Sequence, residues 1–110
     1  SAQNNITTSV KFDHLVHDFG DVHQGDSAVH FFKFTNTGKQ PLLISEIKST
    51  CSCTATDWPK KAVAPGASGK IRVSFSTADK NGYYAKGVNM HSNAGESNMI
   101  IDIHVIPAVK

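Results

Sequence analysis

Long apolar runs are missing from this 110-residue sequence, which also contains only two cysteines and one tryptophan. No run approaches the ~20 apolar residues that a membrane-spanning helix needs. The lysines are scattered, and Lys60-Lys61 is their only adjacent pair, so the basic stripe interleaved with aromatics that is typical of nucleic-acid binders is absent. The net charge of +2 and the charged fraction of 18% are those of a globular protein, and the length fits one domain.

Motifs of the common catalytic sites are lacking as well. A serine hydrolase of the elbow type needs Gly-x-Ser-x-Gly, which does not occur,. The nine acidic residues are dispersed, whereas glycosidase chemistry needs two facing carboxylates. Asp18-Phe19-Gly20 spells the magnesium-binding triplet of protein kinases, but a kinase also needs a glycine-rich phosphate loop and a far longer chain. We therefore expect no enzymatic activity, no catalytic residue and no cofactor.

Apolar residues alternate with polar ones at a period of two and nowhere keep helical spacing for three turns,. About seven such segments follow one another, separated by turn signals every ~8–12 residues. They lie at 10–19, 27–36, 42–47, 54–57, 71–76, around Val88 and Met90, and at 99–105. The pattern predicts an all-β protein, a seven-stranded immunoglobulin-like β-sandwich, with a small barrel as the alternative. We expect a polar segment over residues 1–9 and a single domain over residues 10–110.

Three local features refine this prediction. The segment 27–36 is apolar on both faces, which indicates a central strand or one with a second covered face,. The apolar parity shifts between Ile44 and Ile47, which predicts a bulge,. Asn81-Gly82 is the strongest hairpin signal, because both residues tolerate positive φ,. The expected core consists of Phe32, Phe34, Ile44, Ile71, Val73, Phe75, Val88, Ile101 and Ile103.

Cys51-Ser52-Cys53 is the most informative motif, because residues two apart on an extended segment share a face,. Three interpretations remain open. The thiols could be reduced packing residues, or a strained and easily reduced disulfide pair. They could also be ligands of a soft metal such as Cu(I) or Zn(II). A metal would need further ligands, and Met90 and His91 are the best candidates, although neighbours on a strand face opposite sides,.

The six histidines and the single tryptophan give weaker signals. His14 and His17 are three residues apart, so on a strand they would point to opposite faces. His30 shares parity with Phe32, which predicts a half-buried ring. We expect each histidine to be a solvated or hydrogen-bonded surface group. Trp58 precedes Pro59 just after the cysteines, where it would cap the end of the sandwich or offer a recognition surface.

A set of short motifs, taken together, resembles one protein family. In order, they are His17-Asp18-Phe19-Gly20-Asp21-Val22, Gly25-Asp26, Phe32-Lys33-Phe34-Thr35-Asn36-Thr37-Gly38, Pro41-Leu42-Leu43-Ile44, Cys51-Ser52-Cys53-Thr54, Trp58-Pro59, Ala64-Pro65-Gly66 and Ile71-Arg72-Val73-Ser74-Phe75. The string resembles the bacterial domain of unknown function 1573 family, which is similar to immunoglobulin-like modules of the major-sperm-protein and cilia-associated type. The resemblance implies a β-sandwich, usually in exported proteins of Bacteroidetes-like bacteria, and no established activity. The family more often has Gly between its two cysteines, where this chain has Ser52.

Two functional hypotheses follow. The first is a non-catalytic binding or scaffolding module that meets a protein partner through a sheet edge or its loops. The second is a copper-binding or thiol redox protein that uses Cys51 and Cys53. The polar start of the chain, at Ser1, reads as a mature form whose targeting segment has been removed,. We therefore expect a periplasmic, cell-surface or extracellular location.

Overall fold

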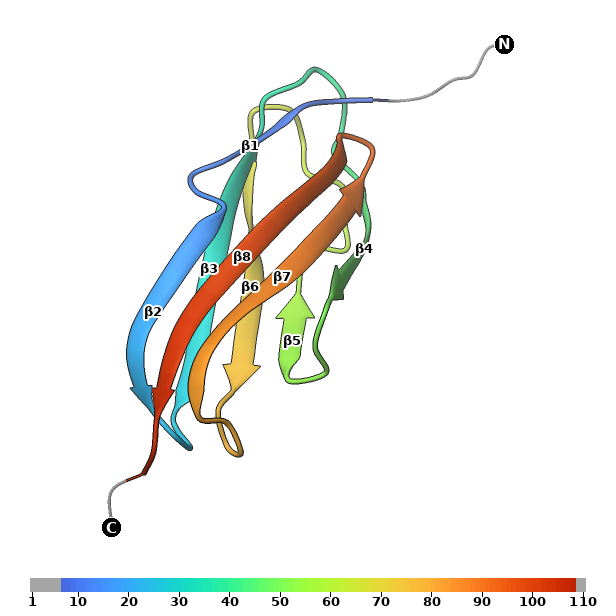
Figure 1. The fold of residues 1–110 in the computed structure, drawn as a ribbon. Helices are drawn as coiled ribbons and strands as arrows, with labels where there is room; N and C mark the ends of the chain where they lie inside the picture. Colours follow the sequence, from blue (N-terminus) through green and yellow to red (C-terminus); the bar gives the residue numbers. More distant parts are fainter. Residues whose placement is uncertain (1–6, 109–110) are drawn as a thin grey trace.

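The computed structural model describes residues 7–108, which form eight strands and no helix (Figure 1). The strands are β1 (Val10–Phe12), β2 (Val16–His23), β3 (Ser27–Asn36), β4 (Ile44–Ser49), β5 (Thr54–Asp57), β6 (Ser68–Ser76), β7 (Gly82–Ser92) and β8 (Gly95–Ile106). Sheet A has the order β1-β3-β6-β5, and sheet B has the order β2-β8-β7-β4. The described residues contain no helix that could cross a membrane.

The strand count is eight because the segment expected as one strand over 10–19 divides between the two sheets. Its first part, β1, pairs antiparallel with β3 in sheet A, and its second part, β2, pairs parallel with β8 in sheet B. The crossing occurs at a polar bend. There the Asp13 N–H still donates to the Lys33 carbonyl of sheet A, while the Leu15 carbonyl already accepts from the Ile100 N–H of sheet B. The inward positions change from even to odd residue numbers at this bend, so that Phe12 and Phe19 pack against the core whereas Val16 is 52% exposed. This break in alternation does not reveal which strand each part pairs with.

Asn81-Gly82 does not close a hairpin, contrary to the sequence-based prediction. It lies between β6 of sheet A and β7 of sheet B, so the chain crosses from one sheet to the other there. Gly82 has a φ of 106°, which explains the turn signal. The β7–β8 hairpin instead closes through Asn93 and Ala94, with Ser92 opposite Gly95. The bulge expected between Ile44 and Ile47 is present as a register shift between Ile44 and Glu46.

The core lies between the two sheets, where inward-facing positions of the strands are almost fully closed to solvent. All the expected core residues are buried except Ile44, which is partly buried and packs against the core. Leu42, Met90, Met99 and Val105 are also fully buried there, and Ala28, Ile47 and Val63 belong to the same core. On β3 the inward Phe32 is fully buried, whereas its outward neighbour Phe31 is 46% exposed. The second apolar face of β3 is therefore uncovered in this domain.

Asn36 is a buried polar residue at the end of β3, and its side-chain amide is fully hydrogen-bonded,. Its Oδ1 accepts from the Thr8 hydroxyl at 2.7 Å and from the Gly38 N–H at 3.0 Å. Its Nδ2 donates to the carbonyl oxygens of Gln40 at 2.7 Å and Val63 at 2.9 Å. One side chain thus joins the start of the described chain to two loops.

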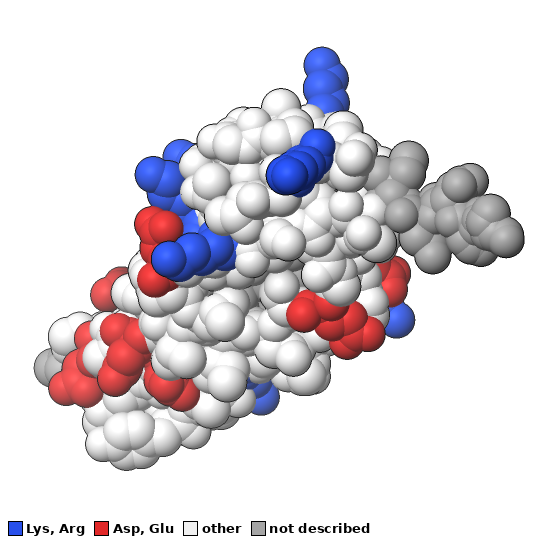
Figure 2. Space-filling model, turned by 90° about the horizontal axis from the view of Figure 1, so that it is seen from above, with Lys and Arg blue, Asp and Glu red and all other residues white. Residues whose placement is uncertain are grey.

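Charged side chains are not evenly mixed over the surface. Seen from above, the largest group of acidic residues lies at the lower left of the molecule, with no lysine or arginine between them in this view (Figure 2). Sheet B carries such acidic side chains on its outer face, where Asp18 of β2 lies opposite Asp102 of β8. Both line a hollow with Asp21 and Tyr83. The outer face of sheet A instead carries lysine and arginine side chains, among them Lys70 and Arg72.

Candidate functional site

The outer face of sheet A carries a groove that follows β6. Alternation along β6 sends its apolar side chains into the core and leaves Lys70, Arg72 and Ser74 outside,. The register places Phe31 of β3 on one side of Arg72 and Asp57 of β5 on the other. Three hollows lie along β6, and neighbouring hollows share a lining residue, since Arg72 lines the first two and Lys70 the second and third. We call this surface the outer groove; its principal lining residues are Phe31, Lys33, Trp58, Lys70, Arg72 and Ser74.

Aromatic rings form the middle of the outer groove, and cations lie against them. The ammonium group of Lys60 lies 3.3 Å from the centroid of the Trp58 ring, and that of Lys70 lies 5.1 Å from the centroid of Phe31, which are cation–π distances. Trp58 is partly buried and packs against the core, and it also lines the outer groove. A ligand in the outer groove would contact the partly buried ring of Trp58 and the exposed ring of Phe31.

The outer groove has an excess of positive charge. Two carboxylates line it: Asp57, which is paired with Lys60 at 3.4 Å, and Asp26, which lies in the hollow that also contains Cys53. Within residues 7–108, Lys33, Lys70 and Arg72 form no ion pair. Lys33 and Lys70 also lie directly opposite each other in the β3–β6 pairing, and like charges in that arrangement oppose folding. Folding stability therefore does not account for this group of cations.

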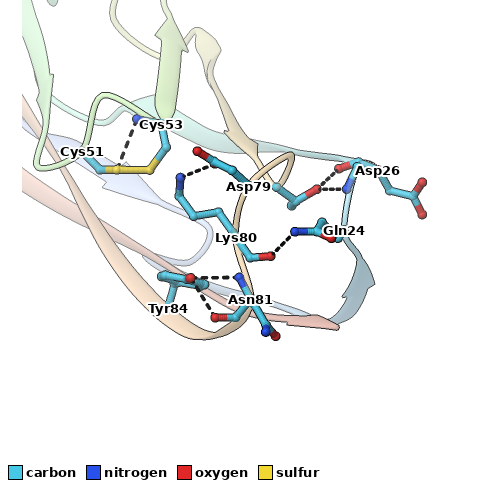
Figure 3. Close-up of polar contacts among 10 residues, drawn as sticks. Gln24, Asp26, Cys51, Cys53, Asp79, Lys80, Asn81 and Tyr84 are labelled. Atoms are coloured by element: carbon cyan, nitrogen blue, oxygen red, sulfur yellow. Dashed lines mark hydrogen bonds and ion pairs between the residues drawn. A yellow bond between two sulfur atoms is a disulfide. The ribbon is translucent and has the colours of Figure 1, made fainter. Parts of the chain in front are cut away.

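The structure brings Cys51 and Cys53 together as a disulfide (Figure 3). Their Cα atoms are 5.2 Å apart, and the Cys53 N–H donates to the Cys51 Sγ at 3.2 Å. The Cys53 carbonyl accepts from the Ser76 N–H at 2.9 Å, which ties the loop to the end of β6. Cys53 and the exposed Ser52 line the hollow at this end of the outer groove.

Met90 and His91, the other two expected metal ligands, do not join the cysteines. Met90 is fully buried in the core. His91 points to the other face of β7, where its Nδ1 lies 3.6 Å from a Glu96 carboxylate oxygen. The β4–β7 register pairs Ser49 with Val88, so Met90 lies further up the strand from the loop that holds the cysteines. The expectation that these two neighbours face opposite sides agrees with their burial.

Sequence reasoning missed a cluster of histidines on the opposite side of the sandwich. One ring nitrogen each from His14, His17 and His30 lies within 4.8 Å of the other two. The expectation that His14 and His17 diverge was wrong, because His14 lies in the bend between β1 and β2 and does not follow strand periodicity. His30 is half-buried on β3, as expected from its parity. The sequence signal for this bend was the break in the alternation of apolar and polar residues at 13–15.

The structural class follows from the topology and the loops. Two four-stranded sheets face each other, and Tyr84, near the start of β7, accepts from the Asn81 N–H at 3.0 Å and donates to the Asn81 carbonyl at 2.8 Å (Figure 3). A tyrosine that bonds back to the backbone where the chain changes sheets is a mark of immunoglobulin-like sandwiches. The domain is therefore an immunoglobulin-like β-sandwich, and its solved structural neighbours include a PapD-like domain.

The chain belongs to the family described as "Protein of unknown function (DUF1573)", whose model matches residues 10–106. This confirms the resemblance seen in the sequence motifs. No curated protein matches the chain.

Three solved structures illustrate the fold. A protein of unknown function from Porphyromonas gingivalis W83 is similar with a TM-score of 0.81 and 14% identity, over 94% of this chain and 50% of that one. This chain thus spans about half the length of the Porphyromonas protein. The ASH/PapD-like domain 7 of human CEP192 has a TM-score of 0.78 and 11% identity, over 99% of this chain and 92% of that one. The secreted serine protease VesC of Vibrio cholerae has a TM-score of 0.62 and 17% identity, over 91% of this chain and 23% of the protease.

Proposed function

We propose that this domain is a non-catalytic protein-binding module that works outside the cytoplasm and holds an extended acidic segment of a partner protein in the outer groove. The observation that carries this proposal is the combination of an exposed Phe31 with Lys70 and Arg72, cations that form no ion pair among the described residues. Exposed aromatics and arginine are the residues that dominate binding energy at protein interfaces.

The outer groove favours an extended occupant because it follows a single strand. β6 has nine residues, which at about 3.3 Å per residue span about 30 Å. An extended partner segment of similar length would place alternate side chains toward the sheet. Its apolar side chains would contact Phe31 and Trp58, and its carboxylates would meet Lys70 and the planar guanidinium of Arg72, which suits bidentate binding.

The face of sheet A suits a partner better than the sheet edges do. The edge strands β1 and β5 have only three and four residues. The other two edge strands, β2 and β4, each contain a register shift. Short and bulged edges are the features by which sheets avoid pairing with another strand. We therefore place the partner on the face and not on the edge that the sequence first suggested.

Location outside the cytoplasm is supported by the disulfide and by one structural neighbour. Disulfides persist in oxidising compartments and are rare in the cytosol. VesC, part of which shares this fold, is a secreted protein. In the periplasm or at the cell surface, Cys51 and Cys53 would remain bonded. Protein denatured without reductant should then resist maleimide labelling, whereas full labelling of protein taken directly from cells would contradict the proposed location.

Binding in the outer groove can be measured through Trp58, the only tryptophan of the chain. The probe is a capped nine-residue peptide whose odd positions alternate glutamate with leucine and whose even positions are serine, so that both residue types face the sheet when the peptide is extended. The comparison peptide carries lysine in place of glutamate. We expect the acidic peptide to change the Trp58 fluorescence saturably, with an affinity that falls as salt is added, and the basic peptide to leave it unchanged.

Matched variants locate the binding. Arg72→Glu and Phe31→Ser should each weaken binding of the acidic peptide by about tenfold or more, the loss typical of an interface hot spot. Lys48→Glu makes the same charge change on sheet B, and Tyr83→Ser removes an aromatic that is 81% exposed on sheet B. Both controls should bind as the wild type does. Equal affinity for both peptides, or equal losses in the groove and control variants, would overturn the proposal.

The second candidate function is a thiol redox or copper-binding role for Cys51 and Cys53, and the disulfide beside the exposed Ser52 is the observation that favours it. A partner dithiol would give up two electrons and two protons and become a disulfide, leaving the two cysteines as thiols. Once deprotonated, this pair has the sulfur ligands that Cu(I) prefers. On the reduced protein, a colorimetric Cu(I) chelator should lose copper to the wild type but not to a Cys51→Ser, Cys53→Ser double variant. Equal competition by the two proteins would exclude the copper role.

A further inference from the structure

Three histidines meet where the chain passes from one sheet to the other. His14 comes from the bend between β1 and β2, His17 from β2 in sheet B and His30 from β3 in sheet A. The Nε2 atoms of His14 and His30 are 2.9 Å apart, and the rings of His17 and His30 stack with centroids 3.7 Å apart and planes 9° from parallel. Residues from three segments of the chain therefore bring imidazole nitrogens within 4.8 Å of one another.

Aromatic rings support the cluster from the core side. Phe19 contacts His17 edge to face with centroids 4.6 Å apart, and Phe32 contacts His30 in the same way at 4.7 Å. Burial lowers the pKa of His30 below its usual value, and the charges of the neighbouring His17 and His14 lower it further,. The rings of His17 and His30 are therefore backed by aromatic side chains, so that their positions are set by packing.

We infer that His14, His17 and His30 form a binding site for a divalent transition-metal ion of the class that prefers imidazole, with Zn²⁺ as its simplest representative. Imidazole nitrogen is a favoured ligand of Zn²⁺ and Cu²⁺, and three protein ligands leave a coordination position for water or for a group from a partner. This site is separate from the outer groove and from the cysteines, so it does not depend on the proposed function.

The distances are close to those that a metal requires. Nitrogens bound to one tetrahedral Zn²⁺ at about 2.0–2.1 Å lie about 3.3 Å from one another. The pair His14 and His30 is already at 2.9 Å, and the largest separation in the group is within 4.8 Å. Metal binding would replace the hydrogen bond between His14 and His30 and tilt the stacked ring of His17 so that its lone pair converges with theirs. His14 is exposed, which gives an ion a path from solvent.

Such a site would also join the two sheets at the edge where β2 lies beside β3. β2 and β3 belong to different sheets, and a bound ion would link His17 of one to His30 of the other. Because the unfolded chain does not hold these residues together, binding would stabilise the folded state. Zn²⁺ should therefore raise the unfolding temperature of the domain.

The test uses tag-free protein with its disulfide intact, so that no thiolate can bind metal. Zn²⁺ is titrated against a chromophoric chelator, and Co²⁺ absorption reports the coordination geometry. We expect one equivalent of Zn²⁺ to bind, a tetrahedral Co²⁺ spectrum, and a loss of more than about tenfold in affinity for each of His14→Gln, His17→Gln and His30→Gln, since even outer-shell changes cost that much.

His23→Gln is the matched control, because His23 is an exposed histidine at the far end of the same strand β2; it should bind Zn²⁺ as the wild type does. If substitution of the half-buried His17 or His30 disturbs folding, His14→Gln still tests the metal site, because His14 is exposed and lies outside the strands. The inference is overturned if His14→Gln binds Zn²⁺ and Co²⁺ as tightly as the wild type, or if Zn²⁺ raises the unfolding temperature of both proteins equally.

Discussion

The outer faces of sheets A and B carry opposite charge on nearly the same architecture. Sheet A places Lys33 directly opposite Lys70, with Arg72 two residues further along β6. Sheet B places Asp18 directly opposite Asp102 in the β2–β8 pairing. Like charges directly opposite each other oppose strand pairing, and both sheets tolerate one such pair. Neither pair is explained by the stability of the fold.

The inner faces show no such difference, and the contrast separates two kinds of constraint. Both sheets send fully buried apolar side chains inward, for example Val73 from sheet A and Ile103 from sheet B. Close packing determines those positions, whereas solvent leaves the outward positions free to serve binding. The charged side chains on the outer faces are therefore candidates for a role in binding, whereas the apolar side chains on the inner faces are set by the packing that folding requires.

The largest expected effect comes from comparing a substitution on the inner face of sheet A with one on its outer face. Phe75→Ala should lower the free energy of unfolding by about 3–5 kcal/mol, because it removes a buried ring and leaves a cavity. Phe75 is 2% exposed, whereas Phe31 is 46% exposed. Phe31→Ala should therefore cost less than about 1 kcal/mol. Urea unfolding measures both values, and similar losses would show that the outer groove is part of the folding core.

The next largest effect compares one glycine from each sheet. A Cβ added to Gly69 of β6 would lie 2.6 Å from the buried ring of Phe34, whereas one added to Gly87 of β7 would lie 4.0 Å from the Thr50 methyl group. Gly69→Ala should cost about 1–3 kcal/mol through overpacking. Gly87→Ala should be neutral or stabilise by up to about 1 kcal/mol, because glycine weakens a strand interior. Denaturant midpoints that shift equally would mean that the ring of Phe34 moves aside freely.

A smaller effect tests the corner at which the chain passes from sheet A to sheet B. Tyr84→Phe removes both hydrogen bonds to the Asn81 backbone and keeps the ring that packs near Phe75, 5.8 Å away between centroids. We expect a loss of about 0.5–1.5 kcal/mol, the net value of such a bond, together with faster amide exchange at Asn81. An unchanged exchange rate would indicate that water replaces the hydroxyl without cost.

The smallest effects come from reversing one charge on each face. Lys70→Glu would face Lys33, and Asp102→Lys would face Asp18, so each variant turns a like-charge pair into an opposite one. Each should stabilise the domain by about 0.2–1 kcal/mol, and the gain should shrink in high salt. Unfolding at low and high ionic strength checks both variants. Only Lys70→Glu should also weaken binding of the acidic peptide.

Local alternation predicted much of the fold because each strand must turn one side to the core. The segment 71–76 and the short strand Thr54–Asp57 lie where the sequence placed them, and the bulge after Ile44 is present. The paired cysteines were also a local signal, since residues two apart share a face. Their bonding as a disulfide was one of three chemical states that the same spacing allows.

Which sheet a strand joins was not a local property, and this accounts for the two errors in topology. The break in alternation within 10–19 does not reveal which sheet the chain enters next, and Asn81-Gly82 turns the chain equally well within a sheet or between sheets. The same limitation hid the histidine cluster. His30 is separated by sixteen residues from His14, and only the crossing of the chain brings their rings together.

The amino-acid sequence by itself determined that this chain forms strands, which of their faces are buried and where most turns lie, because these depend on side-chain alternation and on the backbone freedom of a few residues. The tertiary structure decided that cations of β3 and β6 lie with Trp58 along one row of hollows, and that three histidines from three segments come within 4.8 Å of one another. Both depend on the pairing of strands far apart in the chain, and that pairing is selected by the packing of the whole core.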